Sequence, residues 1–225
     1  MSWFLNFYRS AIGKKTVMAL TGIILFGWIT AHMLGNLKLY LGASHFNEYA
    51  HWLREMGAPA VPNEALLWVS RVVLLISVAL HIHATVTLTL MNRKARPEGY
   101  KGKKYVAASY ASRTMRWGGL LILLFIIYHL LHLTWGSVHP SFSPTDPYHN
   151  VVAGLQVGWV AIFYIVAQIA LGLHLYHGLW SLFQSLGWNH PRFNKWRRSF
   201  ATTFALLIVA GNLSFPIAIL LGAVK

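Results

Sequence analysis

Twelve histidines occur in the sequence, and seven of them fall within long apolar stretches: His32, His81, His83, His129, His132, His174 and His177. Ionisable side chains inside a bilayer are costly and mostly face a bundle interior or a cofactor. Imidazole is a common protein ligand of haem iron, and two imidazoles from facing helices give a bis-histidine iron. Because four different stretches each carry such a histidine, the pattern favours haem ligation over interhelical histidine bonds or a histidine-lined ion path.

The sequence contains no cysteine. This excludes disulfides, zinc thiolate sites and cysteine-ligated iron–sulfur clusters within the chain. Any redox chemistry of the chain must therefore use a metal held by histidine or an organic cofactor.

The apolar stretches that carry the histidines are long enough to cross a membrane. Hydrophobic residues make up 56% of the chain and charged residues only 11%, whereas a soluble domain has about 25% charged residues. A spanning helix needs about 20 mostly apolar residues, and five stretches qualify: residues 16–41, 64–91, 114–137, 151–183 and 200–224. We expect a single domain over residues 1–225, an all-α integral membrane bundle of five transmembrane helices enclosing two haems.

The basic residues predict how the bundle is oriented. The chain has 19 lysines and arginines against five acidic residues. The lysines and arginines are concentrated at the N-terminus, in the loop over residues 93–116 and in the loop before the fifth span. These three segments all fall on one side of the membrane. The positive-inside rule makes that side cytoplasmic, with the N-terminus inside and the C-terminus outside. In so apolar a chain, the charge indicates anionic lipid or an acidic protein partner, not nucleic acid.

Depth in the membrane sorts four of the histidines into two pairs. His32 and His129 each lie about 16 residues from the cytoplasmic start of their helix, which is about 24 Å toward the outer face. His81 and His174 each lie about 10 residues before the cytoplasmic end of theirs, or about 15 Å from that face. We therefore expect an outer pair, His32 with His129, and an inner pair, His81 with His174.

Three spans offer a second histidine. His83 follows His81 by two residues and lies about 200° round the helix, so the two cannot share a face. His132 and His177 each follow the first histidine of their span by three residues and share its face. Spacing alone does not choose between the members of those two pairs.

Several arginines fall near the expected haems. Arg71 lies about two turns inside the outer end of the second span, where it either meets a haem propionate or extends to the outer headgroups. Arg113 and Arg116, at the cytoplasmic start of the third span, are candidates for the inner haem, although the positive-inside rule explains them more simply. On the outer side, residues 41–56 form either a short interfacial helix or an ordered loop.

Eight short segments, in four groups along the chain, resemble the cytochrome b subunits of succinate dehydrogenase and fumarate reductase, of the single-polypeptide, five-helix, two-haem type. Residues 10–22 (SAIGKKTVMALTG) and 32–36 (HMLGN) resemble the opening of that family. Residues 80–82 (LHI) and 92–97 (NRKARP) resemble the end of its second helix, and residues 112–117 (SRTMRW) and 128–132 (YHLLH) its third. Residues 173–181 (LHLYHGLWS) and 184–187 (QSLG) resemble its fourth. The likeness covers nearly the whole chain in the right order.

The resemblance implies which histidines bind iron. Carried over by motif, the axial ligands of two b-type haems fall on His32, His81, His129 and His174. It implies an inner haem on His81 and His174, close to the cytoplasmic iron–sulfur subunit, and an outer haem on His32 and His129. In part of the family an acidic residue two positions before the last ligand assists proton movement; Gly172 stands there in this chain, which argues against that proton route.

The resemblance also implies a function. Succinate would be oxidised in a flavoprotein subunit, and electrons would pass through an iron–sulfur subunit docked on the cytoplasmic face to a quinone in this anchor. The chain itself would carry out no succinate chemistry. The place implied is the cell inner membrane, with further association of complexes possible. Two other interpretations are the cytochrome b anchor of another quinone-linked dehydrogenase, which typically has four helices, and a haem-free membrane transporter.

A quinone site cannot be derived directly from the sequence. A quinone needs an apolar slot with hydrogen-bond donors near a haem edge. The candidates near the inner haem are Ser10, Arg9, Trp180, Ser181 and Gln184, and those near the outer haem are His45, Asn47, His51 and Glu64.

Overall fold

The computed structural model describes residues 2–95, 98 and 110–225. These residues form helices and connecting loops, in the order α1 (Ser2–Arg9), α2 (Ala11–Asn36), η1 (Leu37–Leu41), α3 (Ala43–Glu55), α4 (Ala65–Lys94), α5 (Tyr110–Leu133), α6 (Pro147–Gln156), α7 (Gly158–Ser185) and α8 (Pro191–Leu220). Part of the basic loop, with Arg96, Lys101, Lys103 and Lys104, lies outside the described residues.

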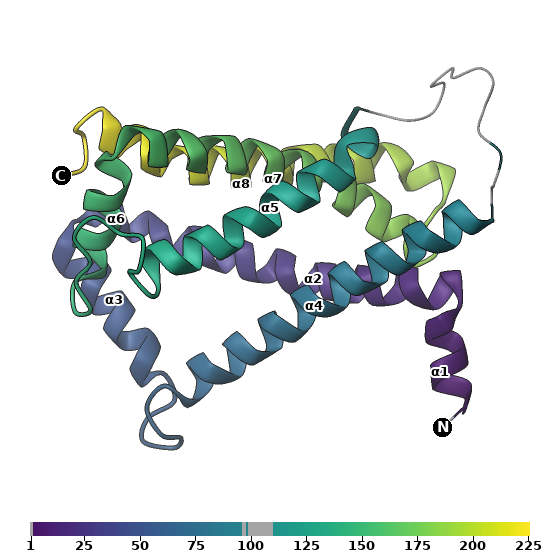
Figure 1. The fold of residues 1–225 in the computed structure, drawn as a ribbon, viewed down its shortest axis with the longest axis horizontal. Coiled ribbons are helices and arrows are strands. Elements are labelled where there is room, and N and C mark those ends of the chain that lie inside the picture. The colour runs from purple at the N-terminus through teal and green to yellow at the C-terminus, as the bar shows by residue number, and fades with distance from the viewer. Residues whose placement is uncertain (1, 96–97, 99–109) are drawn as a thin grey trace.

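Five of the helical segments are long and apolar enough to span a membrane: α2 with η1, α4, α5, α7 and α8. They run along the long axis of the molecule, while α1 and α3 lie across it at opposite ends (Figure 1). The predicted all-α transmembrane bundle is therefore confirmed, and the chain is a multi-pass membrane protein.

The spans pack as two groups. The largest helix–helix interfaces join α2 to α4, α7 to α8, and α5 to α7. The groups meet where α2 touches α7 and α8, and Met33 of α2 packs with Leu175, Ala205 and Ile208 there. A second core cluster, which includes Leu39, Leu155 and Phe215, closes the end of the bundle where α3 and α6 lie.

Some helix boundaries differ from those predicted. The stretch 151–183 is not one helix: α6 ends at Gln156, Val157 has an extended backbone (φ −73°, ψ 106°), and α7 starts afresh at Gly158. Both sides of the break are apolar, so composition did not reveal it. The last helix begins at Pro191 rather than 200, because proline fits the first turn of a helix, where its missing N–H is not needed. Residues 43–55 form helix α3, so the ordered-loop alternative there is wrong.

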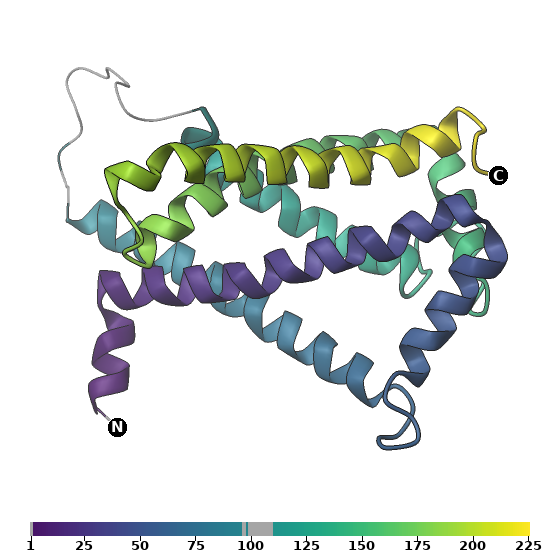
Figure 2. The same ribbon diagram turned by 180° about the vertical axis from the view of Figure 1, so that it is seen from behind.

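The charged residues divide between the two ends of the bundle. The start of α2, the end of α4 and the start of α8 lie at one end (Figure 2), and they carry Lys14 and Lys15, Arg93 and Lys94, and four basic residues of α8. The other end holds four of the five acidic residues, Glu48, Glu55, Glu64 and Asp146. The three basic segments of the sequence thus gather on one face.

Candidate functional site

The outer histidine pair joins α2 to α5. The rings of His32 and His129 face one another with their centroids 5.9 Å apart and their planes at 88°. On the far side of His129, its Nδ1 lies 3.3 Å from the hydroxyl of Tyr164 on α7. Trp28, one turn before His32, stacks on that ring at 5.9 Å. Each imidazole of the pair thus has an aromatic neighbour, Trp28 beside His32 and Tyr164 beside His129.

The inner pair joins α4 to α7. The ring centroids of His81 and His174 are 6.3 Å apart, with their planes at 53°. Thr21 of α2 donates its hydroxyl hydrogen to the Val17 carbonyl at 2.8 Å, so its oxygen accepts from His81 Nδ1 at 3.1 Å. This leaves Nε2 of His81 with its lone pair. In the described part of the chain, the buried Nδ1 of His174 has no hydrogen-bond partner.

The three alternative histidines have other surroundings. His83 is exposed, and its Nδ1 lies 2.5 Å from the Tyr8 hydroxyl. His132 is fully buried, is 3.0 Å from the Tyr164 hydroxyl, and stacks on His139 at 4.9 Å. His177 is half-buried and belongs to neither facing pair. The geometry therefore brings together the same four rings that the depth argument pairs; that they bind iron stays a prediction.

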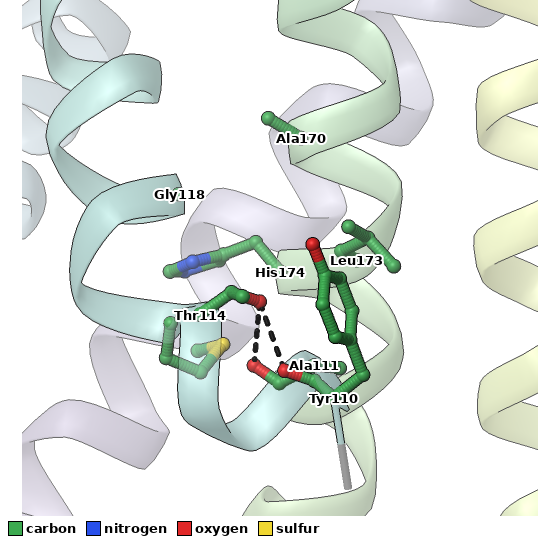
Figure 3. A pocket seen from close by; sticks show the side chains of 8 residues that line it. Tyr110, Ala111, Thr114, Gly118, Ala170, Leu173 and His174 are labelled. Atoms are coloured by element: carbon green, nitrogen blue, oxygen red, sulfur yellow. Dashed lines mark hydrogen bonds between the residues drawn. The ribbon is translucent and has the colours of Figure 1, made fainter.

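Space beside the inner pair comes from glycines on the neighbouring helices. A Cβ at Gly22 of α2 would lie 3.7 Å from His81 Cε1, and one at Gly119 of α5 would lie 3.9 Å from His174 Cε1. A cavity of about 60 Å³ opens next to His174, as Figure 3 shows, and is lined by Tyr110, Ala111, Thr114, Met115, Gly118, Ala170, Leu173 and His174. The surroundings of the inner pair are thus formed partly by small side chains.

The ring separations fit a bis-histidine metal. Two imidazoles that bind one metal from opposite sides, at about 2.0–2.1 Å each, hold their ring centroids about 6–6.5 Å apart. The observed values of 5.9 and 6.3 Å lie at or close to this range. Each pair offers two nitrogens, and a haem needs two axial ligands because its macrocycle supplies the rest. A haem iron therefore suits both pairs, and in each pair a hydroxyl group contacts Nδ1 of one histidine, as is usual for histidines that bind a metal.

Besides the histidines, six residues are secondary candidates for binding haem or quinone, and three of them make other contacts. Ser10 caps α2, accepting from Gly13 N at 2.9 Å, and the Trp180 ring lies under the guanidinium groups of Arg197 and Arg198, at 4.6 and 5.3 Å. Arg71 is exposed, with its guanidinium 4.8 Å over the Trp68 ring.

The remaining three candidates lie toward the basic end of the bundle. Gln184 and Arg116 are exposed. Arg113 has its guanidinium 5.9 Å from the centre of the Tyr110 ring. None of the six secondary candidates lines the cavity beside His174.

Four hydroxyl residues near the pairs were not predicted. Thr21 and Tyr164 contact ligand histidines on other helices, so only the rotation of the helices about their axes reveals them. Tyr110 and Thr114 precede Gly118 at intervals of four residues, which places all three on one face of α5. That periodicity, read together with the histidine on the next span, is the signal that could have found the cavity.

Comparison with known protein families gives a match. A family model described as the succinate dehydrogenase/fumarate reductase transmembrane subunit matches residues 89–213. This range holds the end of α4, all of α5, α6 and α7 and most of α8, so it includes His129 and His174 but not His32 or His81. No curated protein and no solved structure matches.

Proposed function

This chain belongs to the succinate dehydrogenase/fumarate reductase transmembrane subunits, and we propose that it conducts electrons between the iron–sulfur subunit of such a complex and a membrane quinone through two b-type haems. One observation carries the proposal: each of the two histidine pairs joins the α2–α4 group to the α5–α7–α8 group. In each pair, the distance between the ring centroids suits one iron.

In this proposal His81 and His174 hold the inner haem, and His32 and His129 the outer one. A bound haem supplies an iron that accepts and releases one electron at a time. Thr21 and Tyr164 orient His81 and His129 through Nδ1, and a hydrogen bond at that nitrogen raises the basicity of a ligand histidine. Gly22 and Gly119 keep the helix surfaces beside the inner ligands flat.

The basic end of the bundle is the docking face in this proposal. It would lie on the cytoplasmic side of the inner membrane, with the flavoprotein and iron–sulfur subunits beneath it. Among the described residues, both ion pairs are formed near the other end, by His51 with Glu55 and by Arg54 with Glu64. The exposed cations of the basic face, such as Arg93, Arg192 and Lys195, are therefore available to steer and orient an acidic partner.

The cavity beside His174 adds two residues, Tyr110 and Thr114, to the candidates for a quinone site. It borders an inner ligand, and Tyr110 and Thr114 bring hydroxyl groups to its edge (Figure 3). These two residues are better placed than Ser10, Trp180 and Gln184, which do not line it. A quinone headgroup approaching here would meet an apolar slot with a few polar groups, as such ligands require.

The proposal is tested by the visible spectrum of the purified complex. We expect about two b-type haems per chain, from a dithionite-reduced minus oxidised spectrum and a pyridine haemochrome assay. His81→Ala and His174→Ala should each remove the inner haem and spare the outer one. His83→Ala and His177→Ala are matched controls, since each removes an imidazole from the same helix, and both should keep two haems.

Two results would contradict the assignment. An intact complex without haem would exclude electron transfer through this chain and leave the histidines a packing role. Loss of both haems in His81→Ala, from a complex that still assembles, would show that the pairing is wrong.

A further inference from the structure

Helix α1 has two unlike sides. At about 100° per residue, Trp3, Phe4 and Phe7 fall on one side of the helix and Asn6 and Arg9 on the other. The apolar side is uncovered: Trp3 is 76% and Phe4 72% exposed, and the Trp3 and Phe7 rings stack on each other at 6.1 Å. Large exposed aromatic side chains of this kind mark a surface that has a partner.

The corner between α1 and α2 is firmly built. Ser10 accepts from Gly13 N at 2.9 Å and donates to the Phe7 carbonyl at 2.6 Å. Gly13 lies so close to the Phe7 carbonyl that a Cβ there would overlap it. The ammonium of Lys14 lies 4.5 Å from the centre of the Tyr8 ring.

The Tyr8 hydroxyl then meets His83 of α4 at 2.5 Å. Helix α1 is thus tied to two spans, and its direction is fixed.

That direction is across the spans. Helix α1 leaves the basic end of the bundle and runs across the direction of α2 (Figures 1 and 2). Because α2 crosses the membrane, a helix that runs across it at its end lies along the membrane surface. An amphipathic helix there places its apolar side against the acyl chains, and tryptophan is enriched at that depth.

The charges at the corner identify the lipid. Arg9 and Lys15 are exposed, whereas Lys14 is buried, with its ammonium over the Tyr8 ring. In the part of the chain that the structure describes, none of the three forms an ion pair with a carboxylate. Two exposed cations without a carboxylate partner, beside an apolar helix face, match a phosphate-rich, anionic headgroup layer.

We propose that α1 is a surface anchor that lies in the headgroup region of the bilayer, buries Trp3, Phe4 and Phe7 among the acyl chains, and binds anionic phospholipid through Arg9 and Lys15. The proposal needs only that the five spans are in a membrane, so it does not depend on haem or quinone.

The absence of cysteine in the chain permits a direct test. Phe4→Cys and, as its matched control, Asn6→Cys are labelled with an environment-sensitive fluorophore in the whole complex in lipid nanodiscs. In-gel fluorescence assigns the label to this subunit, and the labelled wild-type complex gives the background. We expect the label at position 4 to emit at shorter wavelength, to be quenched by a lipid-borne nitroxide and to be protected from aqueous iodide, and the label at position 6 to behave in the opposite way.

Two outcomes of this test overturn the proposal. Equal iodide quenching at both positions would place α1 in water. Protection of position 4 from iodide without quenching by the lipid nitroxide would show that a protein partner covers the apolar side.

The preference for anionic lipid has its own test. Arg9→Gln/Lys15→Gln should lower the amount of phosphatidylglycerol that co-purifies with the complex, by about half or more, without changing the amount of phosphatidylethanolamine. Arg192→Gln/Lys195→Gln removes the same two charges from exposed positions at the same end, on α8, and should leave both amounts unchanged. An equal loss in the two variants, or no loss in either, would contradict binding by α1.

Discussion

The hydroxyl of Tyr164 is shared by two histidines, at 3.3 Å from His129 Nδ1 and 3.0 Å from His132 Nδ1. A phenol has one hydrogen to donate, so it donates to one ring and accepts from the other. A ligand histidine normally donates from the nitrogen that does not bind the metal. His129 as a ligand would therefore donate to Tyr164, and Tyr164 would donate to His132. The second histidine of α5 would thus support the ligand histidine by accepting the hydrogen of the Tyr164 hydroxyl.

Tyr164→Phe removes this oxygen and keeps the ring. We expect both haems to remain and the midpoint potential of the outer haem to rise, because His129 becomes a less basic ligand; a tenfold change in the one-electron equilibrium is about 59 mV. A redox titration of the visible spectrum measures it. Tyr128→Phe is the control, since the buried Tyr128 hydroxyl has no hydrogen-bond partner among the described residues; an equal shift in both variants would argue against the Nδ1 contact.

Gly154 on α6 is a second residue whose replacement has a definite expected effect. An added Cβ would lie 2.6 Å from His132 Cε1 and 2.9 Å from His139 Nε2. His139 cannot easily move, because its ring is bonded to the Asn150 carbonyl at 2.7 Å and to Ser141 N at 3.0 Å.

Gly154→Ala should therefore cost about 1–3 kcal/mol, as overpacking does, and lower the thermal unfolding midpoint of the complex. At Gly27 an added Cβ meets nothing within 4 Å. Gly27→Ala should thus be neutral or slightly stabilising, and a fall in Tm there as large as at 154 would refute the steric explanation.

At the scale of elements, α3 and the start of α6 are joined by one cluster of hydrogen bonds around Asp146. Asn47 of α3 donates to the Asp146 carboxylate at 2.9 Å and accepts from Tyr148 N at 2.9 Å, while the same carboxylate accepts from His149 N. The His149 backbone N–H, and then the Asn47 side chain, lower the pKa of Asp146 below its usual 3.8. This cluster of hydrogen bonds therefore fixes the start of α6, and with it the packing around His132.

Asp146→Ala should lower stability by about 1 kcal/mol, the usual value of a lost N-cap, and Asp146→Asn should lose less, because its amide oxygen still accepts from the backbone. A lowered folded-state pKa means that the carboxylate stabilises above its unfolded pKa and that the contribution is lost only as pH falls through the folded value. The difference in Tm between wild type and Asp146→Ala should thus not shrink as the pH is lowered from 8 to 5. A difference that shrinks over that interval would contradict it.

The spans were predictable from sequence because each is a long apolar run, and the facing histidines were predictable because depth depends only on position along a helix. Rotation about the helix axis and breaks inside apolar sequence were not. Val157 is as apolar as its neighbours, yet α6 turns there to pack on α3 and α8. Thr21 and Tyr164 carry no local signal, since each meets a histidine on another helix.

At the scale of the whole molecule, the odd number of spans and the basic end together predict the topology. With Lys14, Arg93 and Arg192 at one end, the positive-inside rule predicts that Lys225 lies outside. Alkaline phosphatase fused after Lys225 should be active in whole cells, and green fluorescent protein fused at the same point should be dark. The reverse result would invert the orientation and remove the cytoplasmic docking face.

The division of the spans into α2–α4 and α5–α7–α8 has a consequence for how the protein can be made. Almost all of the close helix packing lies between spans that are successive in the chain, so each group can reach its own arrangement as it leaves the ribosome. The covalent link between α4 and α5 then serves to keep the two groups in one chain during insertion, and the packing of the helices does not require it. Two genes, one ending after α4 and one beginning before α5, should yield separately inserted pieces that assemble into the same five-helix subunit.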